Sequence, residues 1–184
     1  MATATKTKSK TTNMITAVFR ERAKANQAYH WLMTHGYTSD DVNVLMSDTT
    51  RSQFEEENKG KEHAGSHATE GVATGGTIGS VIGATAAAIF AIGTSVAIPG
   101  LGLMVAGPIV AGLAGAGAGA VAGGLVGGLI GLGIPESNAK AYEKALHDGG
   151  VVIGVTPFDG DDESRIKEVF TELDGENVIV SSTK

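Results

Sequence analysis

The chain has 184 residues, no cysteine, and a formal net charge of −6 from 14 Lys and Arg against 20 Asp and Glu. This acidic balance argues against a nucleic-acid partner, because phosphate binding needs clustered basic side chains. Without cysteine the sequence offers neither a disulfide framework nor a thiolate metal site. Residues 1–13 are rich in Thr and Lys and lack an apolar run, which predicts a disordered basic tail and no signal peptide.

A β-α-β unit is predicted over residues 14–48. Residues 14–20 are rich in β-branched and aromatic side chains, which is typical of a strand. Residues 21–35 predict a helix that Gly36 ends in a left-handed conformation. Residues 41–47 alternate between polar and apolar side chains and predict a second strand. The helix carries apolar residues on one predicted buried stripe: Ala25, Ala28, Tyr29 and Leu32.

A second β-α-β unit is predicted within residues 136–182. A strand over 151–156 is followed by a helix over 163–174 and a last strand over 177–181. This helix also has one apolar face, made by Ile166, Val169, Phe170 and Leu173.

Two polar segments flank the middle of the chain. Residues 49–70 form a polar lead-in, expected to be helical in part. Residues 136–149 predict a helix with Ser137 at its N-cap position, and its predicted inward residues are Ala139, Tyr142 and Leu146. The whole pattern predicts an α+β fold, a ferredoxin-like split β-α-β domain with a long insertion between its second and third strands.

The insertion is an uncharged segment over residues 71–135. These 65 residues contain no Asp, Glu, Lys, Arg or His, and 33 of them are Gly or Ala. We expect a hairpin of two apolar helices, over residues 71–98 and 103–134. Each helix would exceed the ~20 residues that cross a bilayer core. The turn between them is signalled by Pro99, Gly100 and Gly102.

Glycines recur at every fourth residue along both predicted helices, which places them on one slowly drifting face. Such a face lets another helix approach to near backbone contact, as in a glycine zipper. Glycine in a helix costs about 1 kcal/mol relative to alanine, so tight packing has to compensate. The zipper positions are Gly75, Gly79, Gly83, Gly107, Gly115, Gly119, Gly123, Gly127 and Gly131.

A helical hairpin that is apolar on every side must be buried in something. A lipid bilayer is one candidate, because the lengths fit and charge is absent, although no Trp or Tyr marks an interfacial belt. Homo-oligomeric assembly through the hairpins is the other candidate. A low-complexity linker is the third reading, and its high apolar content disfavours it.

Several motifs resemble one bacterial family. They are Ile98-Pro-Gly-Leu-Gly102, Ala106-Gly-Pro108, Gly131-Leu-Gly-Ile-Pro-Glu136, and the helix and strand that run from Ala141 to Val155. Together they resemble the bacterial general stress protein family, the heat-induced type with a glycine-zipper insert, over about residues 14 to 182. The resemblance implies a stress-associated, non-enzymatic protein, and it supplies no catalytic residues.

The sequence offers only weak chemical candidates. His63 and His67 have the i, i+4 spacing of helical metal ligands, but a solvated lead-in explains them equally well. The acidic run Asp159 to Glu163 is interpreted as a cap at the start of the next helix, whose N-terminus its negative charges stabilise. The Gly-rich stretch from Gly115 to Gly119 follows no strand and precedes no lysine, so nucleotide binding is rejected.

Together, the residues and the family resemblance predict a non-enzymatic stress-response protein without a cofactor. Its hairpin is expected to insert in a membrane or to join copies of the chain. The α/β domain would then be cytoplasmic, held at the inner membrane by the hairpin. The alternative is a small-molecule or metal-sensing module that uses the open face of the ferredoxin-like sheet.

Overall fold

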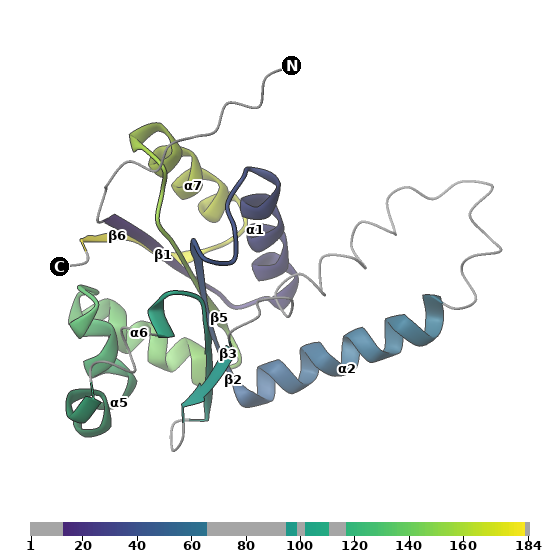
Figure 1. Cartoon of the computed structure of the whole chain (residues 1–184), viewed down its shortest axis with the longest axis horizontal. Coiled ribbons are helices and arrows are strands. Elements are labelled where there is room, and N and C mark those ends of the chain that lie inside the picture. Colours follow the sequence, from purple (N-terminus) through teal and green to yellow (C-terminus); the bar gives the residue numbers. More distant parts are fainter. Residues whose placement is uncertain (1–12, 66–94, 99–101, 111–116, 183–184) are drawn as a thin grey trace.

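Six strands form one antiparallel sheet with the spatial order β3-β4-β2-β5-β1-β6 (Figure 1). The computed structural model describes residues 13–65, 95–98, 102–110 and 117–182. The strands are β1 (Asn13–Phe19), β2 (Val42–Ser47), β3 (Ser95–Ile98), β4 (Leu103–Ala106), β5 (Val151–Val155) and β6 (Glu176–Ser182). The helices within the described residues are α1 (Arg22–Thr34), α2 (Asp48–Gly65), α5 (Gly117–Gly131), α6 (Glu136–His147) and α7 (Gly160–Glu172). The protein therefore has a mixed α+β fold.

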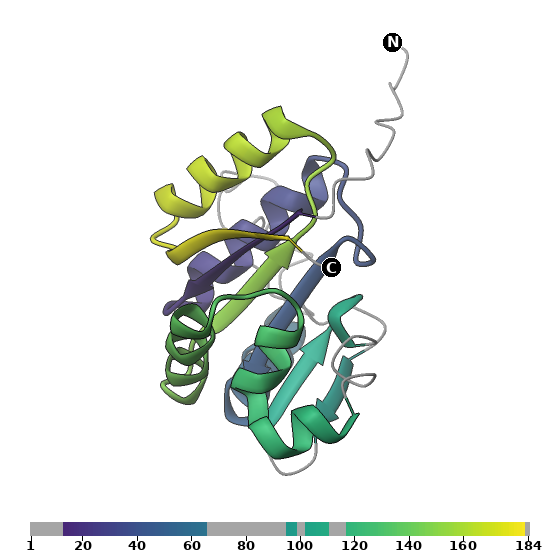
Figure 2. The ribbon, with the colours of Figure 1, turned by 90° about the vertical axis from the view of Figure 1, so that its left-hand side faces the viewer.

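Helices cover both faces of the sheet (Figure 1, Figure 2). Successive residues of a strand point to opposite faces, so β1 divides its side chains between two hydrophobic cores. Ile15, Ala17 and Phe19 belong to the core that α1 and α7 close. Met14 and Val18 belong to the core that α5 and α6 close. The sheet is thus the middle layer of three, and both of its faces are buried.

The elements predicted on either side of the uncharged segment are confirmed, with ends that differ by no more than three residues. All four residues of the predicted α1 stripe are buried, as are the three predicted inward residues of α6. On α7, Ile166 and Phe170 are buried, whereas Val169 and Leu173 are half-buried. Gly36 has a φ of +91°. This conformation lets the Tyr37 N–H donate to the Leu32 carbonyl at 3.2 Å and end α1.

The helix α2 occupies much of the polar lead-in, which was expected to be helical in part. The Ser47 hydroxyl accepts a hydrogen bond from the Thr50 N–H at 3.1 Å, which caps the first turn. Phe54 is fully buried against the core under α1. Beyond Phe54 the helix runs away from the sheet (Figure 1). Its 18 residues extend over about 27 Å.

The predicted helical hairpin is wrong on both sides of its turn, although α5 lies within its second predicted helix. The residues on either side of the predicted turn are the strands β3 and β4, which pair from Ser95 with Ala106 to Ile98 with Leu103. β4 also pairs with β2, from Val44 with Ala106 to Ser47 with Leu103, and all its residues are buried. A stretch rich in glycine has weak helix preference, so pairing with β2 decides its structure. The turn itself is confirmed at Gly102, which has a φ of +60°, while Pro99 and Gly100 lie outside the described residues.

The second predicted helix, residues 103–134, is also interrupted after β4. Gly107 has a φ of +95° and is not helical. Ile109 and Val110 are helical again, and residues 111–116 lie outside the described residues. Helix α5 is described from Gly117, and it contains a kink at Gly124, where φ is 60° and ψ is −157°. The described part of the uncharged segment therefore belongs to the folded domain. It supplies two strands and one covering helix, and it is not a separable appendage.

The start of α6 differs from the prediction in one detail. The helix begins at Glu136, and Pro135 occupies the N-cap position without a side-chain cap. The Pro135 carbonyl accepts from the N–H groups of Asn138 and Ala139 at 3.0 and 2.9 Å. The prediction that Ser137 caps this helix was wrong, because the proline already begins the helical turn before it.

Candidate functional site

The zipper positions divide into three groups in the structure. Gly75, Gly79, Gly83 and Gly115 lie outside the described residues. Gly107 lies in a tight turn after β4. The remaining four, Gly119, Gly123, Gly127 and Gly131, lie in α5, where the kink at Gly124 interrupts their common face. The structure therefore does not bring the zipper positions onto one straight helix within the described residues.

Gly107 allows the chain to pass directly against the start of β2. A Cβ at this position would collide with the Val42 carbonyl oxygen and lie 2.9 Å from the Asn43 Cα. Just beyond, the Ile109 N–H donates to the buried Asn43 Oδ1 at 2.7 Å. Gly107 and Asn43 together fix the segment after β4 to the central sheet. Gly107 thus serves close packing, as a zipper glycine would, but its partner is a strand and not a helix.

Helix α5 packs on α6 and closes the second core. Leu125 and Leu129 are buried there, together with Leu146 of α6 and Val105 of β4. The outer side of α5 is exposed: Ile130 keeps 43% of its surface accessible, and Gly131 is exposed beside it. A Cβ at Gly131 would meet no atom within 4 Å. This glycine is therefore not engaged in packing among the described residues.

A buried tyrosine ties α6 to two strands beneath it. The Tyr142 hydroxyl shares a 2.9 Å hydrogen bond with the Thr16 hydroxyl of β1, and it donates to the Asn177 carbonyl of β6 at 2.7 Å. Burial raises the pKa of Tyr142 to about 12, so the side chain is neutral at physiological pH. Thr16 and Asn43 lie on the sheet face that α5 and α6 cover, which the sequence analysis had left open. The signal in the sequence was a polar residue within each of two otherwise apolar strands, because such a residue needs a partner once the strand is buried.

The two edges of the sheet differ in character. β6 is one edge, and it is irregular: its pairing with β1 shifts register between Thr16 and Val18, and Asn177 has a φ of +51°. The first residue of β6, Glu176, is charged. β3 is the other edge of the sheet in the described residues, and it is uncharged and regular, with Val96 48% exposed.

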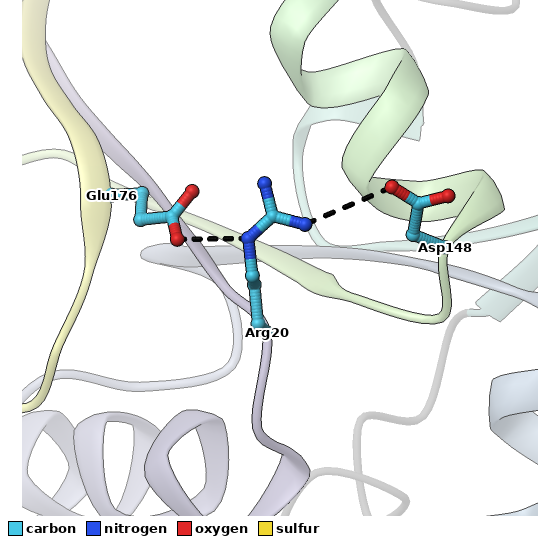
Figure 3. Close-up of polar contacts among 3 residues, drawn as sticks. All are labelled: Arg20, Asp148 and Glu176. Carbon is cyan, nitrogen blue, oxygen red and sulfur yellow. Dashed lines mark hydrogen bonds and ion pairs between the residues drawn. The ribbon is translucent and has the colours of Figure 1, made fainter.

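An ion-pair network holds the charged end of β6 (Figure 3). Arg20 Nε donates to Glu176 Oε1 at 2.8 Å, and Arg20 Nη1 lies 3.7 Å from Asp148 Oδ2 at the end of α6. The hydrogen bond from Arg20 lowers the pKa of Glu176 below its ordinary value. All three side chains are exposed, so water screens the network. It joins the end of β1, the end of α6 and the start of β6.

The weak chemical candidates gain no site from the structure. His63 lies in α2 and His67 lies outside the described residues. Within the described ranges, no group of three or more His, Cys, Asp or Glu side chains could hold a metal ion. The acidic run at the start of α7 is confirmed as a cap: the Asp159 side chain accepts from the Asp162 N–H at 2.8 Å. No helix in the part of the chain that the structure describes combines the length and apolarity of a membrane span.

No protein-family model, no curated protein and no solved structure matches this chain. In the described residues, the uncharged segment provides the β3 edge of the sheet, where Val96 is exposed.

Proposed function

We propose that this protein is a non-enzymatic bacterial stress-response protein that assembles with copies of itself. The stress association comes from the sequence resemblance described above. The assembly comes from the uncharged segment and from where its described ends are attached.

The core of the sheet supports the ferredoxin-like part of the proposal. β5 lies between β1 and β2, and β1 lies between β5 and β6. Each β-α-β unit is thus split by a strand of the other unit, which is the ferredoxin-like arrangement. We infer that β3, β4 and α5 are an insertion between the second and third strands of this core.

One observation carries the choice of assembly over a spanning hairpin. The segment of 29 residues between Gly65 and Ser95 has both ends attached to the same domain. Two complete helical crossings of a bilayer need about 40 residues. The second half of the expected hairpin cannot supply the missing length, because β4 and α5 are packed in the domain. Association between copies buries uncharged surface without requiring that length.

The sensing alternative loses its main support in this arrangement. It needs an open sheet face, and both faces are covered by helices in the described residues. The polar side chains of the relevant face, Thr16 and Asn43, already have protein partners. The covered faces therefore favour self-assembly over sensing.

The experiment compares the full chain with a variant in which residues 66–94 are replaced by a Gly/Ser linker of equal length. The linker keeps the ends connected and leaves every described core residue in place. Both proteins are expressed in bacteria, and the cell lysate is separated into soluble fraction, carbonate-washed membranes and pellet.

We expect the full chain in the soluble fraction as large particles and the linker variant as a smaller species. Recovery of the full chain only from carbonate-washed membranes, with release by detergent alone, would replace assembly with membrane embedding. Equal particle size for the two proteins would show that residues 66–94 are not needed for assembly, and would leave the described part of the uncharged segment, β3, β4 and α5, as the part that assembles.

A further inference from the structure

The two edge strands differ in how well they prevent pairing with another chain. Natural sheets block their edges with charges, bulges or irregular backbone. β6 has all three: Glu176, the register shift opposite β1, and the left-handed Asn177. β3 has none of them, because it pairs regularly with β4 and no charged residue occurs between residues 71 and 135. Among the strands that the structure describes, the outer edge of β3 has no partner strand.

We propose that β3 pairs with β3 of a second copy of this chain, in an antiparallel arrangement that continues the sheet across two molecules. This proposal rests on the proposed self-assembly and names one interface in it, which joins the copies in pairs. The backbone N–H and C=O groups on the outer edge of β3 would bond to the same groups of the partner strand. Pairing of this kind needs no charge and no side-chain recognition.

The symmetry of such a pair fixes which residues meet. Two identical antiparallel edge strands are related by a two-fold axis normal to the sheet, and this is an isologous contact. Both copies then present the same face on the same side, so a residue near the axis lies opposite its own copy. Val96 pairs with Val105 within the chain and so lies on the face of α5 and α6. Centring the pair on Val96 places two valines directly opposite one another.

The composition of the edge favours a second copy over another partner. Two identical charged edges would repel each other, but an uncharged edge approaches its copy without repulsion. A charged peptide would gain no ion pair along β3, since the uncharged stretch includes both β3 and β4. Val96 is also the large hydrophobic residue with the greatest exposed fraction among the described residues. Val–Val contact across the axis would cover it.

Cysteine substitution tests this register directly, because the chain contains no cysteine of its own. We expect Val96→Cys to form a disulfide-linked dimer under mild oxidation, because the two sulfurs lie across the axis. Ala97→Cys is the neighbouring control and should not link to itself, since its opposite residue is not its own copy. Val180→Cys, on the edge strand β6 and 38% exposed, is the control for random collision.

A charge on the same strand tests the interface without oxidation. Val96→Lys should reduce the mass of the particles at least twofold, and Val180→Lys should leave the mass unchanged. Circular dichroism checks that both variants are folded.

The outcomes separate the two proposals. A monomeric wild-type chain would overturn both self-assembly and this interface. Large wild-type particles with an unaffected Val96→Lys variant, or Val96→Cys linking no more than Val180→Cys, would overturn the β3 pairing alone.

Discussion

Replacing Gly107 by alanine tests how the uncharged segment is joined to the sheet. Gly107 and Gly131 occupy equivalent positions in the four-residue spacing, so a uniform zipper predicts similar effects at both sites. The structure predicts opposite effects. Gly107 has a φ of +95° and no room for a Cβ beside the β2 backbone, whereas Gly131 lies exposed at the end of α5 with open space around it.

The magnitude follows from two contributions at Gly107. An L-residue in a left-handed conformation costs about 1–2 kcal/mol. The added Cβ also pushes the segment off β2, and losing the buried hydrogen bond from Ile109 to Asn43 costs about 1–3 kcal/mol. Gly107→Ala should therefore lower the free energy of unfolding by about 2–5 kcal/mol. Gly131→Ala should leave it unchanged or raise it by up to about 1 kcal/mol, because alanine favours the helix.

Urea unfolding at one fixed protein concentration measures both effects. The fluorescence of Trp31 is a suitable signal, since it is the single tryptophan and lies on α1, across the sheet from α5. A loss below about 0.5 kcal/mol for Gly107→Ala, within the range of ordinary surface substitutions, would refute the packing described here.

Three further predictions concern contacts outside the uncharged segment. Tyr142→Phe removes the hydroxyl that joins β1 and β6, and it should lower the free energy of unfolding by about 1–3 kcal/mol in a urea titration. Asp159→Ala removes the side-chain cap of α7 and should lower the free energy of unfolding by about 1 kcal/mol, measured by thermal unfolding followed by circular dichroism. The pKa of Glu176 is lowered in the folded state by Arg20, so its stabilising effect is present above the ordinary value of 4.5 and is lost as pH falls through the lowered value. Glu176→Gln should therefore have a lower free energy of unfolding than wild type at neutral pH, and the difference should vanish in acid. Urea titrations over a range of pH measure this, and a difference that stays constant with pH would contradict the prediction.

The sequence predicts the flanking β-α-β units well, because each of their elements carries a local signal. The α1 stripe repeats at helical spacing, and Gly36 supplies the positive φ that ends the helix. The strands of the core are rich in Val and Ile and are buried on both faces, so their composition alone marks them.

The uncharged segment shows where sequence reasoning fails. The glycine spacing suggests one helical face. A four-residue spacing places residues on one face only if the segment is helical, and the spacing by itself does not make it so. β4 is a strand because it pairs with β2, and this long-range contact leaves no periodic signal in four residues. Asn43 gives a weaker signal, since a polar side chain in a buried strand needs a partner. Its partner, the Ile109 N–H, is 66 residues further along the chain.

Sedimentation velocity of the purified full chain in detergent-free buffer tests the central claim most directly. Self-assembly predicts species larger than the 18.6 kDa chain, with a mass that rises with protein concentration. A single 18.6 kDa species at every concentration, or a protein that stays in solution only with detergent, would contradict it.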